Sequence, residues 1–177
     1  MHAEASMGTA GLGALLERFA RAVAARDSAG FASLFTRDGR YHDGFFGVHD
    51  GRDAIAAMLE RFYVGGEAFF WQFFDPAVAG DIGYARYVFS YRSRQPDSAG
   101  QVIVFEGIAQ LRLRGGLIAE YDEAFDRGIA FTQLGYDTAR IGKLLGRYSG
   151  EFTASPRARA HLAARPPAAS PSRSGDA

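Results

Sequence analysis

The stretch RYHDGFFGVHDGRDAI (residues 40–55) contains a change of pattern that organises the chain around it. Alternation over 40–43 is typical of a strand, the glycines that follow indicate a turn, and Ile55 opens an apolar helical period. Asp43 stands among aromatic residues inside this stretch. The sequence therefore places a carboxylate at the point where an apolar core begins. The role of this carboxylate depends on which other residues the fold brings close to it.

The chain around this stretch predicts three helices. Apolar residues at helical spacing predict one helix over 10–26 and a shorter second helix over 28–35. A third helix is predicted over 52–63, because apolar side chains there again recur every three or four residues. Each helix would bury one apolar stripe in a common core.

After the third helix the period changes from helical to extended. Four strands are predicted over 67–76, 81–94, 101–114 and 117–125, because β-branched and aromatic residues fill these segments. Gly115-Gly116, between the last two, is a strong hairpin signal. We therefore expect the strands to be joined largely by hairpins and to pair mostly antiparallel.

The end of the chain predicts one more helix and then a tail. A helix is predicted around 138–145, where capping residues precede apolar ones. From about residue 151 Ala, Pro, Ser and Arg dominate and no apolar pattern survives, which predicts a disordered tail over 151–177. We expect a flexible N-terminus at 1–9 and one domain over 10–150.

Composition narrows the classes of function. The 177 residues include 20 Lys and Arg, 20 Asp and Glu, and no Cys, which excludes disulfides, thiolate catalysis and cysteine-based metal sites. The balanced charge does not resemble the basic footprint of a nucleic-acid binder. No apolar run is long enough to span a membrane, and the N-terminal segment lacks the pattern of a secretory signal. We therefore expect a cytoplasmic protein without a nucleic-acid or membrane partner.

Helices first and hairpin-joined strands later indicate an α+β fold. In this order, ARDSAGFASLFTRDGRYHD (25–43), GRDAI (51–55) and GGLIAEYDEAFD (115–126) resemble the NTF2-like superfamily, in particular its SnoaL-like and ketosteroid-isomerase-like branches. QLGYDTARIGKLL (133–145) resembles the extra C-terminal helix of a limonene-epoxide-hydrolase-like subset. The resemblance covers roughly 10–148. It implies an NTF2-like cone, in which N-terminal helices pack on a curved, mostly antiparallel sheet that encloses an apolar pocket.

Asp43 matches the place of the general base in the isomerase branch. An Asp beside apolar groups loses solvation, so its pKa rises toward a value useful in proton transfer. Asp43 could instead cap the turn over 44–47 or pair with an arginine. The two oxyanion donors of that branch are not matched, because Phe19 and Ala109 stand in their places. Steroid isomerisation by that mechanism is therefore not expected.

Glu123 is the second candidate acid. Side chains alternate along a strand, so Glu123 shares a face with Tyr121 and Phe125, and the aromatic pair indicates that this face is the inner one. In the epoxide-hydrolase branch an acidic residue at this place orients or deprotonates water, and SnoaL-like cyclases place a catalytic Asp on this strand. Glu123 could instead form a salt bridge inside the cone or face solvent.

Arg86 is the candidate partner of these acids. The epoxide-hydrolase branch carries an Arg near this position and an Asp two residues later, where this chain has Val88. Arg86 could pair with Glu123 or Asp43, which would hold the carboxylate ionised. It could equally be a structural or surface arginine.

The histidines and the aromatic residues complete the candidate site. His42 and His49 are seven residues apart without a third nitrogen ligand nearby, so no metal site is predicted. His49 precedes the third helix, where it could act as an acid–base partner at the pocket mouth or be an exposed loop histidine. The residues expected to bind the ligand are Phe19, Met58, Phe62, Phe69, Trp71, Tyr84, Val88, Tyr121 and Phe125, with His49 at the rim.

The sequence thus favours a SnoaL-like enzyme that needs no cofactor and acts on a small hydrophobic molecule, such as a polyketide, terpenoid or steroid. It would work by acid–base proton transfer or water activation, as a cyclase, isomerase, dehydratase or epoxide hydrolase. Asp43 or Glu123 would be the base, and Arg86 or Tyr41 would stabilise developing charge.

The alternative is a non-catalytic domain that binds a small ligand or dimerises. Glu106, Ile108, Gln110 and Arg112 alternate with residues that face inward. Their mixed chemistry suits the interface of a homodimer, which we expect on either interpretation.

Overall fold

The computed structural model describes residues 7–166 of the chain. Most of the N-terminus that we expect to be flexible, and the last eleven residues, 167–177, lie outside the described residues. The chain divides into two compact units, Met1–Tyr136 and Asp137–Ala177. In the described part, no helix has the length and apolar character needed to cross a membrane.

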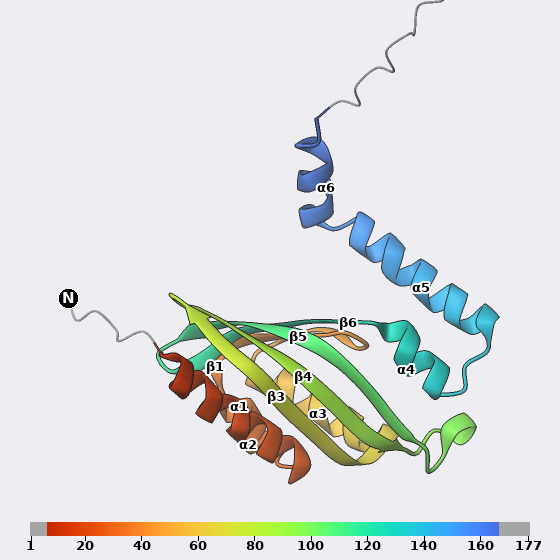
Figure 1. Ribbon diagram of the computed structural model, residues 1–177, viewed down its shortest axis with the longest axis horizontal. Coiled ribbons are helices and arrows are strands. Elements are labelled where there is room, and N and C mark those ends of the chain that lie inside the picture. The colour runs from red at the N-terminus through yellow and green to blue at the C-terminus, as the bar shows by residue number, and fades with distance from the viewer. Residues whose placement is uncertain (1–6, 167–177) are drawn as a thin grey trace, which may run out of the picture. The chain divides into compact units, whose positions relative to one another are not determined.

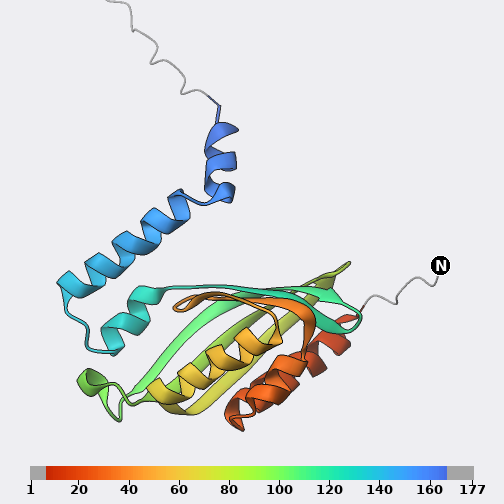
Figure 2. The ribbon, with the colours of Figure 1, turned by 180° about the vertical axis from the view of Figure 1, so that it is seen from behind.

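The first unit packs helices on one face of a six-stranded sheet (Figures 1 and 2). The helices are α1 (Thr9–Ala24), α2 (Ser28–Ser33), α3 (Arg52–Gly65) and α4 (Arg127–Gln133), with a 3-10 turn at Pro96–Ser98. The strands are β1 (Phe35–Asp43), β2 (Gly47–Asp50), β3 (Gly66–Ala79), β4 (Ile82–Ser93), β5 (Val102–Arg114) and β6 (Leu117–Phe125). This arrangement confirms the α+β fold that the sequence predicts.

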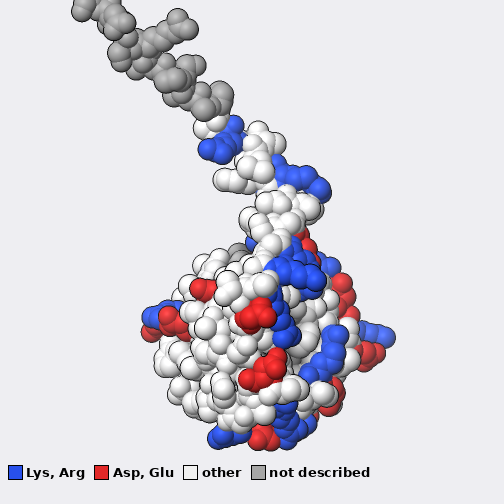
Figure 3. Space-filling model, turned by 90° about the vertical axis from the view of Figure 1, so that its right-hand side faces the viewer, with Lys and Arg blue, Asp and Glu red and all other residues white. Residues whose placement is uncertain are grey.

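The sheet has the order β2-β1-β6-β5-β4-β3. All neighbours pair antiparallel except β1 and β6, which run parallel. That single parallel pairing joins the first strand of the chain to the last, so the ends of both strands reach the same place. Basic and acidic side chains are interspersed over the face seen in Figure 3, as the formal net charge of zero suggests.

The stretch over 40–55 folds largely as its pattern predicts, with one addition. Where the glycines predict only a turn, the structure contains the short strand β2, which pairs with β1. Gly51 adopts φ 82°, in the left-handed region that favours glycine, and its N–H donates to the Gly39 carbonyl at 2.7 Å. Arg52 then donates to the Phe35 carbonyl, which fixes the start of α3 against β1.

Aromatic rings fill the space between α1 and the sheet. Phe19 lies on the buried stripe of α1, and its ring centroid is 5.0 Å from that of Trp71 and 5.2 Å from that of Tyr121. Tyr121 stacks on Tyr41 across the parallel pair, with centroids 4.6 Å apart. Such ring pairs contribute about 0.5–1.5 kcal/mol each beyond the area that they bury.

Strand β4 corrects one expectation about the faces of the sheet. Ala85, Tyr87 and Phe89 are buried on this strand, whereas Tyr84 is 42% exposed. The expectation that Tyr84, Arg86 and Val88 face the ligand is therefore wrong, because alternation places them on the outer face. On β5 the outward direction of Glu106, Ile108, Gln110 and Arg112 is confirmed, since all four are exposed.

The second unit contains two helices, α5 (Thr138–Thr153) and α6 (Pro156–Ala163). α5 confirms the predicted C-terminal helix, and Asp137 caps it by accepting a hydrogen bond from the Arg140 N–H at 2.7 Å. α6 shows that the prediction of a disordered tail from residue 151 is wrong for this segment. The Ser155 side chain caps α6, proline occupies its first turn, and alanine and arginine favour helix without an apolar period.

Candidate active site

Asp43 ends β1 with its side chain turned into the protein, where the residue is only 2% exposed. Its Oδ1 accepts hydrogen bonds from the backbone N–H groups of Phe45 at 2.7 Å and Phe46 at 2.6 Å. Asp43 therefore caps the turn, which was one of the alternatives from the sequence. The cap also holds the carboxylate in a fixed place on the inner side of the sheet.

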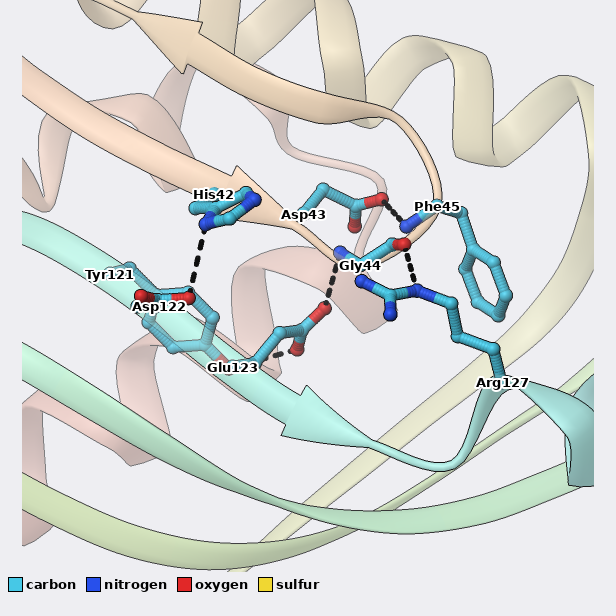
Figure 4. A network of polar contacts seen from close by, with 8 residues as sticks. All are labelled: His42, Asp43, Gly44, Phe45, Tyr121, Asp122, Glu123 and Arg127. Atoms are coloured by element: carbon cyan, nitrogen blue, oxygen red, sulfur yellow. Dashed lines mark hydrogen bonds and ion pairs between the residues drawn. The ribbon is translucent and has the colours of Figure 1, made fainter. Parts of the chain in front are cut away.

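Glu123 reaches the same place from β6 (Figure 4). The parallel register pairs His42 with Asp122, so the next residues of the two strands, Asp43 and Glu123, lie beside each other. The backbone N–H of Gly44 donates to Glu123 Oε1 at 3.2 Å. Glu123 therefore faces inward as predicted, and the two carboxyl groups flank one glycine.

The two acids shift each other's protonation. Burial is the largest cause that raises the pKa of Asp43, and the N–H groups of Phe46 and Phe45 oppose it. Burial, followed by the charge of Asp43, raises the pKa of Glu123 from 4.5 to about 8. With a pKa of about 8 Glu123 holds a proton at neutral pH, because a second charge beside Asp43 would be costly.

Two tyrosine hydroxyls hold the other oxygen of Glu123. Tyr87 Oη donates to Oε2 at 3.1 Å, and Tyr121 Oη lies 3.5 Å from the same atom. Burial raises the pKa of both hydroxyls, as it does for Tyr41, so all three stay neutral donors at physiological pH. Tyr41 lies beside this group, because its ring stacks on that of Tyr121, and the charges of Glu123 and Asp43 add to the rise in its pKa.

Two glycines make room for this arrangement. A Cβ at Gly107 would lie 2.6 Å from Tyr87 Oη and 2.7 Å from the carbonyl oxygen of Ala124. A Cβ at Gly44 would lie 2.2 Å from the nearest ring atom of Phe125. Tyr87 can therefore cross β5 to reach Glu123 only because residue 107 has no side chain.

The arginine near the acids is Arg127 rather than Arg86. Arg127, at the start of α4, donates through Nε to the carbonyl oxygen of Gly44, and its charge lowers the pKa of Asp43 (Figure 4). Arg86 lies on the outer face and pairs with Glu106 at 3.3 Å. The expectation that Arg86 pairs with either acid is wrong because its strand presents it to the opposite side of the sheet.

The two histidines have separate environments. His42 points away from Asp43, and its Nδ1 lies 3.2 Å from Asp122 Oδ1, a contact that raises its pKa. His49 is buried rather than exposed, with Nδ1 3.4 Å from the Arg61 guanidinium, and burial lowers its pKa. Across residues 7–166 no three His, Asp or Glu side chains gather closely enough to hold a metal ion.

The aromatic residues predicted to bind the ligand fall into two groups. The buried ones are Phe19, Met58, Phe69, Trp71 and Tyr121, and Phe62 and Phe125 are partly buried. Tyr84 and Val88 belong to the outer face.

Sequence reasoning missed Tyr87 and Arg127. The parity of β4 contained a signal for Tyr87, because its face also carries Ala85 and Phe89 and no charge. Arg127 had no comparable signal, since its position depends on how α4 follows β6.

Comparisons with known proteins agree with this architecture. A SnoaL-like domain model matches residues 16–121. Among curated proteins no sequence matches the chain.

Three solved structures illustrate the shared fold. A ketosteroid-isomerase-like protein from Catenulispora acidiphila, in complex with trimethylamine, has a TM-score of 0.64 at 21% identity over 70% of this chain and 93% of its own. A candidate polyketide cyclase from Xanthomonas campestris has a TM-score of 0.59 at 21% identity, over 71% and 98%. An epoxide hydrolase from M. tuberculosis, described as LEH-like, has a TM-score of 0.59 at 17% identity, over 71% and 90%. The cone fold and the matched domain together place this chain in the SnoaL-like family.

Proposed function

We propose that this chain is an acid–base enzyme that needs no cofactor and acts on a small hydrophobic molecule. The observation that carries the proposal is the pair of neighbouring carboxyl groups, the buried Asp43 and the partly buried Glu123, both with raised pKa, beside aromatic rings. Two such acids with different environments divide the roles of base and acid between them.

Asp43 is the base in this proposal. Its turn N–H groups and the charge of Arg127 favour the ionised form, while burial keeps its pKa above the ordinary value. Glu123 is the acid, because its pKa of about 8 leaves it protonated at neutral pH. Tyr87 positions Glu123, and Tyr41 is the donor for charge that develops on the substrate.

The substrate class follows from the walls of the interior. The rings of Phe19, Trp71 and Tyr121 pack on one another, and the Tyr121 hydroxyl lies 3.5 Å from Glu123, which suits a polyketide-, terpenoid- or steroid-like skeleton. Proton transfer within such a molecule is isomerisation, cyclisation or dehydration, and proton transfer from water is epoxide hydrolysis. The similar structures named as a polyketide cyclase and an epoxide hydrolase support both directions.

The test uses two probes, one for each direction. Exchange of the α-protons of 1-tetralone in deuterated buffer measures proton abstraction, and formation of diol from styrene oxide measures water activation. We expect Asp43→Asn and Glu123→Gln to lose activity by about 10²–10⁴-fold, the usual contribution of a positioned acid or base. Glu17→Gln is the matched control, because it makes the same chemical change at an exposed position of α1, away from the acids and from the proposed dimer interface.

Two results would contradict the proposal that this chain is an enzyme. Unchanged turnover in both carboxylate variants would remove the pair from the mechanism. Binding of the probes without turnover by the unaltered protein would favour the alternative, a SnoaL-like domain that binds a small ligand without transforming it.

We also infer that the chain forms a homodimer through the outer face of β4 and β5. Tyr84, Val104 and Ile108 are 42–53% exposed there, and the ion pair of Arg86 with Glu106 lies among them. A patch with apolar side chains and both signs of charge can pair with a copy of itself about a two-fold axis.

A further inference from the structure

The inner side of the sheet holds one donor that the proposed chemistry does not use. Trp71 on β3 is 6% exposed, and its indole Nε1 has no hydrogen-bond partner among the described residues. Among the described residues the buried atoms Tyr41 Oη and His49 Nε2 also lack a partner, whereas the hydroxyl of Tyr63 donates to the Val23 carbonyl at 3.2 Å. Leaving a buried N–H unpaired costs about 1–3 kcal/mol, so such a group calls for an explanation.

The surroundings of Trp71 offer it rings rather than acceptors. Its ring centroid is 4.6 Å from that of Phe89, 5.0 Å from Phe19 and 5.7 Å from Phe73. None of these side chains can accept a conventional hydrogen bond. The fourth neighbour of Trp71 is Tyr87, whose ring centroid lies 5.4 Å from that of Trp71. The Tyr87 hydroxyl donates to Glu123.

Tyr87 therefore links the indole to the acids. The Tyr87 ring lies beside the Trp71 ring at a tilt of 58°, and the Tyr87 hydroxyl donates to Glu123, so the indole and the carboxyl pair are neighbours of the same tyrosine. A ligand of one or two fused rings that contacts Glu123 beside Tyr87 therefore has the indole among its nearest neighbours.

We propose that Trp71 Nε1 donates a hydrogen bond to an oxygen of the substrate. This bond would set the orientation of the substrate relative to Asp43 and Glu123. The inference rests on the proposed function, because it assumes that the ligand occupies the interior beside Glu123. An indole N–H donates and cannot accept, so the oxygen must be an acceptor such as a carbonyl, an ether or an epoxide. Hydrocarbons and ammonium groups are selected against at this position.

The chain offers a direct reporter for this inference. Trp71 is the single tryptophan of the sequence, so the protein labelled with nitrogen-15 gives one indole N–H signal. We expect 1-tetralone to shift that proton signal downfield, as a new hydrogen bond does. Tetralin, which has the same skeleton without the oxygen, should leave it nearly unchanged. An indole signal that responds equally to both compounds, or to neither, would overturn the proposal.

Affinities measured by calorimetry provide the second arm. We expect 1-tetralone to bind about tenfold more tightly than tetralin, the effect of one good hydrogen bond. Trp71→Phe should remove this preference and leave the affinity for tetralin within about twofold of its original value. Phe73→Leu is the packing control, because it removes a neighbouring ring, keeps the indole N–H and should change both affinities by the same factor. A preference that survives in Trp71→Phe would refute the role of the indole.

The test of the Trp71 hydrogen bond can fail or succeed independently of the test of the proposed function. If Trp71→Phe abolishes the preference while Asp43→Asn leaves turnover intact, the oxygen site stands and the assignment of the base fails. If the preference never existed but both carboxylate variants are inactive, the acids stand and the indole is only part of the core.

Discussion

Glu123→Gln should stabilise the protein increasingly as the pH rises from 5.5 to 7.5. Burial and the charge of Asp43 raise the pKa of Glu123 from 4.5 to about 8 in the folded state. Between these values the folded chain holds a proton that the unfolded chain has released. The free energy of unfolding therefore falls as the pH rises through this window, with a slope of about 1.4 kcal/mol per pH unit.

The size of the effect follows from the width of that window. From pH 5.5 to 7.5 the unaltered protein should lose about 2–3 kcal/mol through this group. Glutamine cannot ionise, yet its carbonyl oxygen can still accept from the Tyr87 hydroxyl, so the variant keeps the contact and loses the pH slope. His42, whose pKa the contact with Asp122 raises, contributes a fall of the same sign in both proteins, so it cancels in the difference.

Urea unfolding at several pH values measures this difference directly. The midpoint multiplied by the m-value gives the free energy of unfolding for the original protein and for Glu123→Gln. Glu17→Gln serves as the control and should follow the original protein at every pH, because Glu17 is exposed on α1. If Glu123→Gln shows the same slope as the original protein, Glu123 is not held protonated, and the division of roles between the two acids falls with it.

Three further outcomes follow from other parts of the structure. Gly107→Ala should push Tyr87 off Glu123 and lower the free energy of unfolding by about 1–3 kcal/mol; an Ala variant with unchanged stability and turnover would contradict the contact. Ile108→Arg should convert the dimer to a monomer in light scattering, and a native chain that is already monomeric at micromolar concentration would refute the interface. Ser155→Ala should weaken the α6 cap by about 1 kcal/mol, seen as faster amide exchange confined to that helix; an unchanged exchange rate would show that the cap is not needed.

The sequence predicted the long elements well because their patterns are strong. The buried stripe of α1 and the hairpin at Gly115-Gly116 depend on local periodicity and turn chemistry, and both appear as expected. Short elements were harder. β2 has four residues, too few to show alternation, and α6 has helix formers without an apolar stripe, so composition alone resembled a tail.

The alternation of side chains between the two faces of each strand decided which site residues were predicted correctly. On β6 the aromatic partners of Glu123 lie on one face, and the inward direction was read correctly. On β4 tyrosines occur on both faces, so the aromatic pattern did not distinguish them, and the resemblance to an arginine of another branch favoured the wrong one. The charge of Arg86 was the better guide, because an unpaired guanidinium rarely faces an apolar interior.

The two interpretations of Asp43 proved to be compatible, and their combination explains why an acid stands at this point of the chain. A turn with aspartate in front of glycine needs the side chain to bind the next backbone N–H groups, and Asp43 does so through Oδ1. Those bonds stabilise the ionised form, which burial alone would have neutralised. An aspartate buried without the turn would take up a proton and lose its basicity, and an exposed turn aspartate would be too weakly basic. The apolar interior raises the pKa of Asp43 and the turn limits that rise, the balance that the proposed role of general base requires.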